Sequence, residues 1–343
     1  MISEKGIFTR QEIISQPEAW SAALNVLSAA RQAIRDLDGG HFDQVLFTGC
    51  GSTYYLALAA ASLTQELTGC TCRAFPASEL WLNPQCSYTR GKTMLVAVSR
   101  SGETTETLYA CQAFLSDRRG ELLTLSCYDD MPLAKMGTFN LVIPSGQEQS
   151  VAQTRAFSTL YLATVALACL WADRQDLFDS LRRLPEVGRH LHNNYACLAS
   201  ELGCDPGLER FYWLGSGVRH GLACELSLKM KEMSLTHSEP FHFMEFRHGP
   251  KSMVTPGTLV VGLRSSRSSM HETAVLQDVR ALGGRVLDMA EDGSDVRFAS
   301  GLAEVVRDVL YLPVGQLIAF ERSLSKGLNP DRPTNLDTVV KLS

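Results

Sequence analysis

The sequence predicts an α/β protein built as a tandem duplication of a three-layer α/β/α domain with a parallel sheet. Apolar, strand-like runs alternate with segments of helical spacing, which is typical of parallel βα units covered by helices on both faces. The turn Gly49-Cys50-Gly51 recurs as Gly215-Ser216-Gly217. The chain has 343 residues, of which 45% are hydrophobic, and this length accommodates two packed domains.

The first copy contains four strand-like runs and three helical segments. The apolar runs are 45–48, 94–98, 122–126 and 141–144. The segments of helical spacing are 51–67, 103–116 and 150–172. Residues 160–172 are strongly apolar but too few to span a bilayer, so they predict a buried helix.

The second copy follows a polar, helix-prone segment. FYWLGSGVRHGLACELSLKMKE, from Phe211, matches VLFTGCGSTYYLALAAASLTQE, from Val45, with an offset of 166. TLVVGLRSS, from Thr258, matches TMLVAVSRS, from Thr93, with an offset of 165. Two paired features at nearly equal spacing indicate a duplication. We therefore expect a helical lead-in over 1–40, a first domain over 41–180, a helical bridge over 181–208, a second domain over 209–325 and a C-terminal tail over 326–343.

The composition excludes several classes of protein. The net charge of −5 argues against a protein whose main role is to hold nucleic acid. Ten scattered cysteines form no C-x-x-C pair, and the chain starts Met1-Ile2-Ser3 without the pattern of a signal peptide. We expect reduced thiols, a cytoplasmic location and no membrane association.

The first glycine turn is a candidate phosphate site. Residues 49–53 (GCGST) end a strand and open a helix, whose free N–H groups can bind an anion. A dinucleotide site is excluded because Tyr54 replaces the third glycine and no acidic residue stands at the spacing of a ribose contact. The alternative is a turn that merely joins strand to helix.

The next strand ends in a second candidate, Ser99-Arg100-Ser101-Gly102-Glu103-Thr104. Three hydroxyls and a glycine before a helix can surround a phosphate with neutral donors. Helix capping is the alternative, because Ser, Thr and Glu in this order also form a capping box. The second copy has Arg264-Ser265-Ser266-Arg267 here. We therefore expect only the first domain to hold phosphate.

Candidate acid–base residues concentrate between Lys229 and Ser252. Lys229 and Glu232 are three apart, which places them on one helix face, where the carboxylate could move a proton between carbons. His248 lies on a predicted loop and could assist ring opening. An ordinary surface ion pair is the alternative for the first two. The spacing of His237, His242 and His248 matches no zinc pattern, and we expect no metal and no cofactor.

With these motifs in view, the chain resembles the sugar isomerase (SIS) domain family over about residues 25–340. It is similar to the isomerase half of glucosamine-6-phosphate synthase at 49–53, 99–104, 151–157 and 229–250. The resemblance implies contacts to substrate or its phosphate from Cys50, Gly51, Ser52, Thr53, Ser99, Arg100, Ser101, Thr104 and Val151. It also implies Glu232 as the enolising base with Lys229 nearby, a tail that packs near the active site, and His248 offered across the interface of a homodimer with a shared active site.

Departures from that family pattern narrow the expected reaction. From the start Met1-Ile2 we expect no glutaminase domain. Thr338 stands where a lysine is usual, Arg100 replaces glutamine and Gln153 replaces serine. The runs 246–252 and 327–331 resemble the galactosamine-6-phosphate deaminase/isomerase branch, often labelled tagatose-6-phosphate ketose/aldose isomerase. This resemblance implies an enzyme that converts a hexosamine 6-phosphate to a ketose 6-phosphate and ammonia. The alternatives are a fructosamine-6-phosphate deglycase and a non-catalytic phosphosugar sensor.

Overall fold

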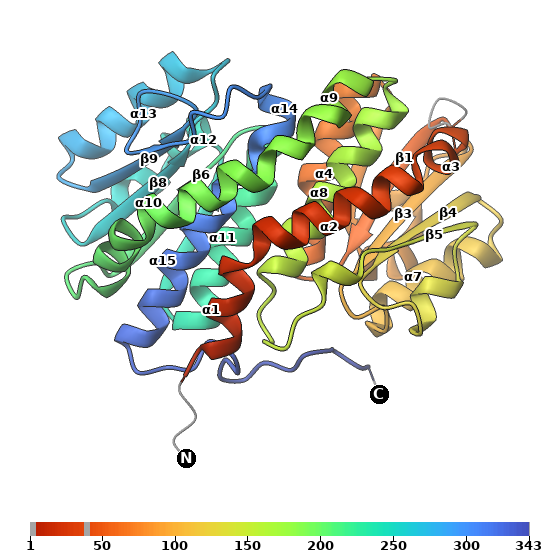
Figure 1. Cartoon of the computed structure of the whole chain (residues 1–343), viewed down its shortest axis with the longest axis horizontal. Helices are drawn as coiled ribbons and strands as arrows, with labels where there is room; N and C mark the ends of the chain where they lie inside the picture. Colours follow the sequence, from red (N-terminus) through yellow and green to blue (C-terminus); the bar gives the residue numbers. More distant parts are fainter. Residues whose placement is uncertain (1–4, 38–41, 343) are drawn as a thin grey trace. The chain divides into compact units, whose positions relative to one another are not determined.

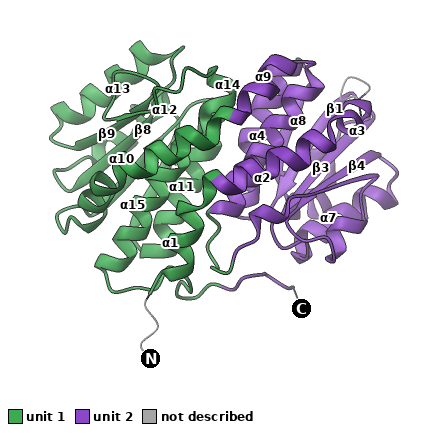
Figure 2. Cartoon of the chain, viewed as in Figure 1, with its two compact units in different colours: residues 1–17, 149–154, 183–336 green, residues 18–148, 155–182, 337–343 purple. Residues whose placement is uncertain are grey.

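The structure is a computed structural model that describes residues 5–37 and 42–342. The chain forms two compact units, coloured separately in Figure 2. Unit 1 comprises residues 1–17, 149–154 and 183–336; unit 2 comprises residues 18–148, 155–182 and 337–343. The first sequence copy lies in unit 2 and the second copy lies in unit 1.

Unit 2 is built on a five-stranded parallel sheet with the order β2-β1-β3-β4-β5. Its strands are β1 (Gln44–Gly49), β2 (Cys72–Pro76), β3 (Thr93–Ser99), β4 (Gly120–Ser126) and β5 (Phe139–Val142). The two central strands β1 and β3 are buried throughout, as expected for a sheet covered on both faces. The sheet and its helices are visible in Figure 1.

Helices form a layer on each face of this sheet. On one face, Leu46 and Leu95 share a core with Ala77 and Leu80 of α5 and with Phe114 of α7. Helices α4 and α8 pack against each other, and α4 also contacts β1. The helices wholly or mainly in unit 2 are α2 (Gln16–Ala29), α3 (Arg31–Asp36), α4 (Ser52–Thr68), α5 (Ala77–Leu82), α6 (Pro84–Ser87), α7 (Thr105–Ser116), α8 (Arg155–Trp171) and α9 (Gln175–Ser180).

Unit 1 repeats the same topology. Its parallel sheet has the order β10-β9-β8-β6-β7, which is the first order read backwards with five added to each strand. The strands are β6 (Arg210–Leu214), β7 (His237–Phe241), β8 (Thr258–Leu263), β9 (Arg285–Ala290) and β10 (Val296–Arg297). Its helices are α1 (Ile7–Ile14), α10 (Leu184–Cys204), α11 (Val218–Ser234), α12 (Phe243–Phe246), α13 (Ser269–Ala281), α14 (Glu304–Arg307) and α15 (Leu312–Ser325).

The strand registers agree between the copies. Val45 pairs with Cys72, and Arg210 pairs with His237, so the partner stands 27 positions later in each case. Because equal order and equal register are difficult to reach independently, these pairings confirm the predicted tandem duplication and the parallel α/β/α class.

Several predicted elements differ in their limits. Strands β2, β7, β9 and β10 were not predicted, and three of them, β2, β7 and β10, are short edge strands without a long apolar run. The predicted helix over 150–172 begins only at Arg155. Residues 149–154 are held in unit 1, where the Glu12 carboxylate accepts hydrogen bonds from the backbone N–H groups of Gln149 and Ser150. Tertiary contacts therefore override helix propensity in this segment.

The polar segment between the copies is largely one long helix. Most of residues 181–208, expected as a bridge, form α10, which groups with unit 1. Pro185 stands in the first turn of α10, where a missing N–H costs nothing, and Pro206 follows its end. The predicted buried helix is α8, whose residues 156–170 are all buried. Within the described residues, no helix is long and apolar enough to cross a membrane.

Candidate functional site

The first glycine turn joins β1 to α4 in unit 2. Gly51 has a φ of 56° and a ψ of −122°, a backbone conformation that side chains disfavour. A Cβ on Gly49 would come within 2.5 Å of the Thr53 hydroxyl oxygen. That hydroxyl accepts from the Cys50 N–H at 2.9 Å and donates to the Cys50 carbonyl at 3.0 Å. The Thr53 hydroxyl therefore stabilises the turn through both backbone groups of Cys50 and uses its proton in doing so.

The second candidate loop follows β3, which is the neighbour of β1 in the sheet. The hydroxyl oxygens of Ser99 and Thr104 are 3.3 Å apart, and those of Ser101 and Thr104 are 3.5 Å apart. The Gly102 N–H donates to the Ser99 hydroxyl at 3.1 Å. We call Ser99, Ser101 and Thr104 the hydroxyl loop. The structure brings these three predicted residues together at the carboxyl edge of the sheet.

The hydroxyl loop does not cap the helix that follows it. Thr104 is the N-cap residue of α7, but its side chain makes no capping hydrogen bond. A capping box would direct this hydroxyl at the N–H groups of the first turn. Instead it points to the hydroxyls of Ser99 and Ser101. The capping interpretation of Thr104 is therefore not supported, and three hydroxyls meet beside a helix amino terminus that favours anions.

Arg100 lies in this loop, but its side chain is engaged elsewhere. It is only 5% exposed. Its guanidinium pairs with Glu148 at 3.5 Å and donates to the Thr338 carbonyl at 3.2 Å. Its carbonyl accepts from the Cys127 N–H at 3.2 Å. These bonds make Arg100 a brace for the loop. Glu148, which the sequence did not single out, is its buried partner.

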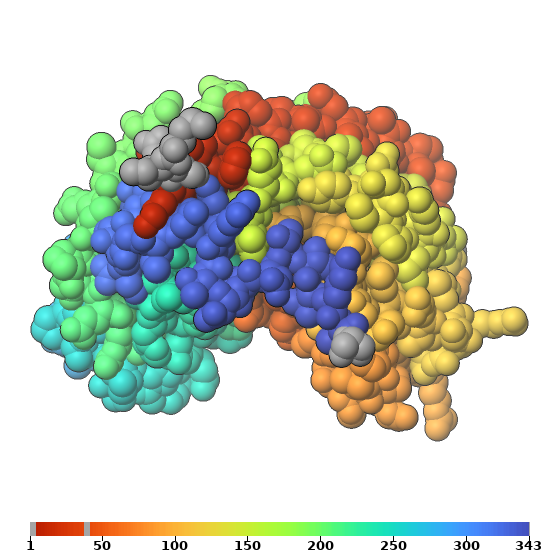
Figure 3. All heavy atoms as spheres, turned by 90° about the horizontal axis from the view of Figure 1, so that it is seen from below, coloured from red at the N-terminus to blue at the C-terminus, as the bar shows by residue number. Residues whose placement is uncertain are grey.

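The C-terminal segment 337–342 lies against the hydroxyl loop within unit 2 and forms part of the blue surface in Figure 3. The Thr105 N–H donates to the Val340 carbonyl at 3.4 Å, and Leu342 N–H donates to the Thr105 hydroxyl at 3.3 Å. Lys341 pairs with Glu103 at 3.1 Å. The segment therefore follows the start of α7, and Thr338 takes part through its backbone carbonyl.

Cys50 faces α7 from the glycine turn. Its Sγ is 3.5 Å from the Thr107 hydroxyl. Burial raises the pKa of the Cys50 thiol to about 11, and the Glu106 carboxylate adds to the rise, while the Thr107 hydroxyl opposes it. The thiol is therefore neutral at physiological pH, so it can line a ligand but is a poor nucleophile.

The predicted acid–base pair lies in unit 1 on α11. Lys229 is fully buried, and its ammonium donates a hydrogen bond to the Glu232 carboxylate. The same ammonium is 3.4 Å from an oxygen of Glu225, one turn earlier. One buried cation thus stands between two carboxylates, of which Glu232 is 20% exposed and Glu225 is not exposed. Glu225 was missed, although its i, i+4 spacing from Lys229 could have identified it.

His248 and Val151 also belong to unit 1 and stand outside α11, the helix that carries Glu232. His248 is exposed on the turn between α12 and the short 3₁₀ helix at Pro250–Met253, as predicted. Val151 is half-buried, and its N–H donates to the Asp331 carbonyl at 3.1 Å. Among the described residues, no group of three or more His, Cys, Asp or Glu side chains is arranged to hold a metal ion.

A model of a known protein family matches both copies of the duplication. The model described as "SIS domain" matches residues 41–170 and 208–296, which together exceed half of the chain. The chain belongs to the SIS domain family. The two matched segments contain the first sheet and all but the last residue of the second, so each copy of the duplication is an SIS segment.

Comparisons with individual proteins agree with this family. A glutamine–fructose-6-phosphate aminotransferase (isomerizing) from Xanthomonas campestris is 28% identical over 356 residues, covering 96% of this chain and 58% of the relative. This chain thus spans less than two thirds of that relative. A glucosamine-6-phosphate deaminase structure from Thermotoga maritima has 27% identity and a TM-score of 0.78, covering 94% of this chain and 100% of the other.

A third likeness concerns the fold alone. The structure of tagatose-6-phosphate ketose/aldose isomerase from Escherichia coli matches with 23% identity and a TM-score of 0.85, covering 96% of each chain. At this identity the match supports the tandem SIS architecture described above.

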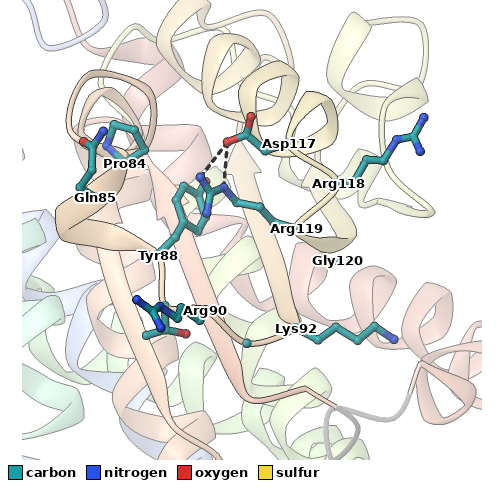
Figure 4. A pocket seen from close by; sticks show the side chains of 11 residues that line it. Pro84, Gln85, Tyr88, Arg90, Lys92, Asp117, Arg118, Arg119 and Gly120 are labelled. Atoms are coloured by element: carbon teal, nitrogen blue, oxygen red, sulfur yellow. Dashed lines mark hydrogen bonds and ion pairs between the residues drawn. The ribbon is translucent and has the colours of Figure 1, made fainter.

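The first SIS copy also has a basic depression of about 770 Å³ at the opposite edge of its sheet (Figure 4). It is lined by Arg90, Lys92, Arg118 and Arg119, close to the amino ends of β3 and β4. Arg119 pairs with Asp117 at 2.7 Å and lies 4.3 Å from the ring centre of Tyr88. Because parallel strands share one direction, this depression is separate from the hydroxyl loop at their carboxyl ends.

Proposed function

We propose that the chain is a phosphosugar isomerase/deaminase that converts a hexosamine 6-phosphate to a ketose 6-phosphate and ammonia. The observation that carries this proposal is the hydroxyl loop of an SIS segment, in which three hydroxyls meet beside the uncapped start of α7. Neutral donors at a helix amino terminus suit a phosphate dianion. The names of the Thermotoga and Xanthomonas relatives, both of which concern hexose or hexosamine 6-phosphates, support the same substrate class.

The reaction requires only acid–base steps. After ring opening, a base removes the proton on C2 to give an enolamine, and a proton is then returned to C1. The product is an imine at C2, and water hydrolyses it to a ketone with release of ammonia. Substrate and one water thus give the ketose phosphate and ammonia, with no change in oxidation state overall.

We assign proton transfer to Glu232 and ring opening to His248. Glu232 is partly exposed, so a substrate can reach it, while the buried ammonium of Lys229 holds its carboxylate in place. Lys229 is fixed by a second carboxylate, Glu225, so we propose that it positions Glu232 and does not itself transfer the proton. The ring of His248 is exposed on a turn, where it could reach a sugar oxygen.

The phosphate contacts are assigned to Ser52, Ser99, Ser101 and Thr104 in unit 2. Gly51 allows the close backbone approach, and Cys50 and Val151 are proposed to line the sugar. Thr53 and Arg100 support the site indirectly, since the hydroxyl of Thr53 closes the turn and the guanidinium of Arg100 braces the loop. We further propose a homodimer with a shared active site.

The test is a panel of amino-sugar and fructosamine 6-phosphates, followed by release of ammonia or amine. On the best substrate, Glu232→Gln should lower kcat about 10²–10⁴-fold, the usual contribution of a general base. Glu239→Gln is the matched control, because the carboxylate of Glu239 is exposed and forms a weak pair with His237 at 4.0 Å. Full turnover by Glu232→Gln would disprove the assignment of the base.

The panel also separates the alternatives. Turnover of fructosamine 6-phosphates alone, with release of the amine, would identify a deglycase. Tight binding of phosphosugars without turnover of any of them would identify a sensor and would overturn the proposed reaction.

A further inference from the structure

The second SIS copy has counterparts of the two candidate phosphate turns. Side chains of the second copy itself occupy the position where a phosphate would bind. Gly217 precedes α11 with a φ of 58° and a ψ of −128°, nearly the conformation of Gly51 before α4. The segment 264–268 follows β8 and precedes α13, as the hydroxyl loop follows β3 and precedes α7. The conformation of the glycine turn is therefore repeated in the copy that lacks the Ser-x-Ser-Gly-Glu-Thr sequence, although Arg267 does not take the positive φ of Gly102.

The carboxylate of Glu304 lies in this second loop. One oxygen accepts from the Ser265 hydroxyl at 2.7 Å, and the other accepts from the Ser266 N–H at 2.7 Å. Arg219, the residue that takes the place of Thr53 after the glycine turn, donates to Glu304 at 2.8 Å. A serine hydroxyl, a backbone N–H and a guanidinium are the donors that proteins use for phosphate.

Two buried arginines lie beside Glu304, and each also pairs with a second carboxylate, Arg219 with Asp308 at 3.4 Å and Arg307 with Glu291 at 3.5 Å. Arg219 is 8% exposed and Arg307 is 4% exposed. Arg307 donates to the Ser266 hydroxyl at 2.6 Å and lies 3.6 Å from Glu304. The Nε of Arg219 is buried without a hydrogen-bond partner in the described structure. This arginine thus has one N–H donor that Glu304 and Asp308 leave unused.

We propose that the second SIS copy holds an anion site that Glu304 occupies as a built-in substitute for a phosphate group. The ligand class is an oxyanion of phosphate, either inorganic phosphate or a phosphate monoester. Glu304 is attached to the chain, so its effective concentration at the loop exceeds that of any free phosphate. The site is thus closed in the native protein, and phosphate binding is confined to the first copy.

The direction of the pKa shift of Glu304 agrees with an ionised carboxylate in this loop. Burial opposes ionisation of Glu304, but the Ser265 hydroxyl, Arg219, the Ser266 N–H and Arg307 outweigh it and lower the pKa of the carboxyl. The neighbouring Glu272 accepts from the Ser265 N–H at 2.6 Å, and burial raises its pKa to about 7. Of these two acids, Glu304 is the one that the loop holds as an anion.

The experiment compares Glu304→Ala with Glu304→Gln and wild type. Equilibrium dialysis with inorganic phosphate, at constant ionic strength, should show one more phosphate per chain for Glu304→Ala than for wild type. Glu304→Gln should match wild type, because the amide still fills the loop. A crystal structure of Glu304→Ala with phosphate should place the ion on Ser265, Ser266 and Arg219.

Phosphate should also rescue the stability of Glu304→Ala more than chloride does at equal ionic strength. Asp205→Ala is the control, since Asp205 bonds to Arg285 and the Gly207 N–H far from this loop, near the start of β6 and β9. If Glu304→Ala folds poorly, its refolding yield in phosphate against chloride gives the same comparison. Equal phosphate numbers in wild type and Glu304→Ala, or equal rescue of both alanine variants, would overturn the proposal.

Discussion

Thr104 illustrates how a single hydroxyl can distinguish two interpretations of one motif. The sequence order suits a capping box, yet the side chain makes no capping bond and faces Ser99 and Ser101. We expect Thr104→Val to leave the melting temperature unchanged within error. The loss of a hydrogen bond to a charged phosphate, worth about 1.5–3 kcal/mol, should raise the substrate KM roughly 10- to 100-fold.

The measurement is steady-state kinetics together with thermal unfolding. Thr68→Val makes the same chemical change at the end of α4, where the hydroxyl donates to the Thr64 carbonyl and accepts from the Cys70 N–H, and should leave KM unaltered. A capping role would appear instead as a stability loss of about 1 kcal/mol with little change in KM. That result would refute the assignment of Thr104 to phosphate.

The Cys50 thiol gives a second prediction at the residue scale. Because burial raises its pKa to about 11, the thiolate is scarce at pH 8, and Cys50 should react with iodoacetamide far more slowly than the exposed Cys86. Peptide mass spectrometry after timed labelling measures both rates. Labelling of Cys50 as fast as Cys86 would show that the thiol is not held neutral.

Among the helices and strands, the start of α13 carries the group, Glu272, for which we predict the strongest effect of pH on protein stability. Burial raises the pKa of Glu272 from its usual value near 4.5 to about 7. The folded protein therefore binds more protons than the unfolded chain between these two values, and its stability falls as pH rises through that window. Glu272→Gln, which can keep the bond from the Ser265 N–H, should remove this fall.

The expected result is a melting temperature for Glu272→Gln that equals wild type near pH 5 and exceeds it by several degrees near pH 8, since about 1 kcal/mol moves the midpoint by a few degrees. Thermal unfolding at both pH values measures it. A difference of the same size at both pH values would mean that ionisation of Glu272 is not the cause.

The helices and strands differ in how far the sequence predicted them. The central strands β1 and β3 were found because each is an apolar run buried on both faces. The edge strands β2, β7 and β10 were missed, since an edge strand needs neither a long apolar run nor alternation. The start of α8 was placed five residues early because the Glu12 carboxylate, 137 positions away in sequence, binds the N–H of Gln149.

At the scale of the whole molecule, the proposed homodimer with a shared active site can be tested by complementation. Glu232→Gln and His248→Ala should each be inactive alone. If Glu232 and His248 act at one site from different subunits, a one-to-one co-expressed mixture should recover roughly a quarter of wild-type activity, because half of the dimers are mixed and one of their two sites is intact.

Size-exclusion chromatography with light scattering establishes whether the protein is a dimer and whether mixed dimers form. Mixed dimers without recovered activity would place both residues at the same site from one subunit. A monomer at working concentration would reject the shared site altogether.

The sequence by itself determined the class of the fold, its duplication and the positions of the two candidate phosphate turns, because apolar periodicity and glycine turns are local patterns. It also indicated the Lys229–Glu232 pair, since helix spacing is regular. Only the tertiary structure decided which partners the individual polar groups bind. Arg100 is bound to Glu148 and Thr338, Lys229 is shared with Glu225, and the second loop holds Glu304. Apart from Glu225, which stands one helical turn from Lys229, these partners come from distant segments, and no local pattern encodes them.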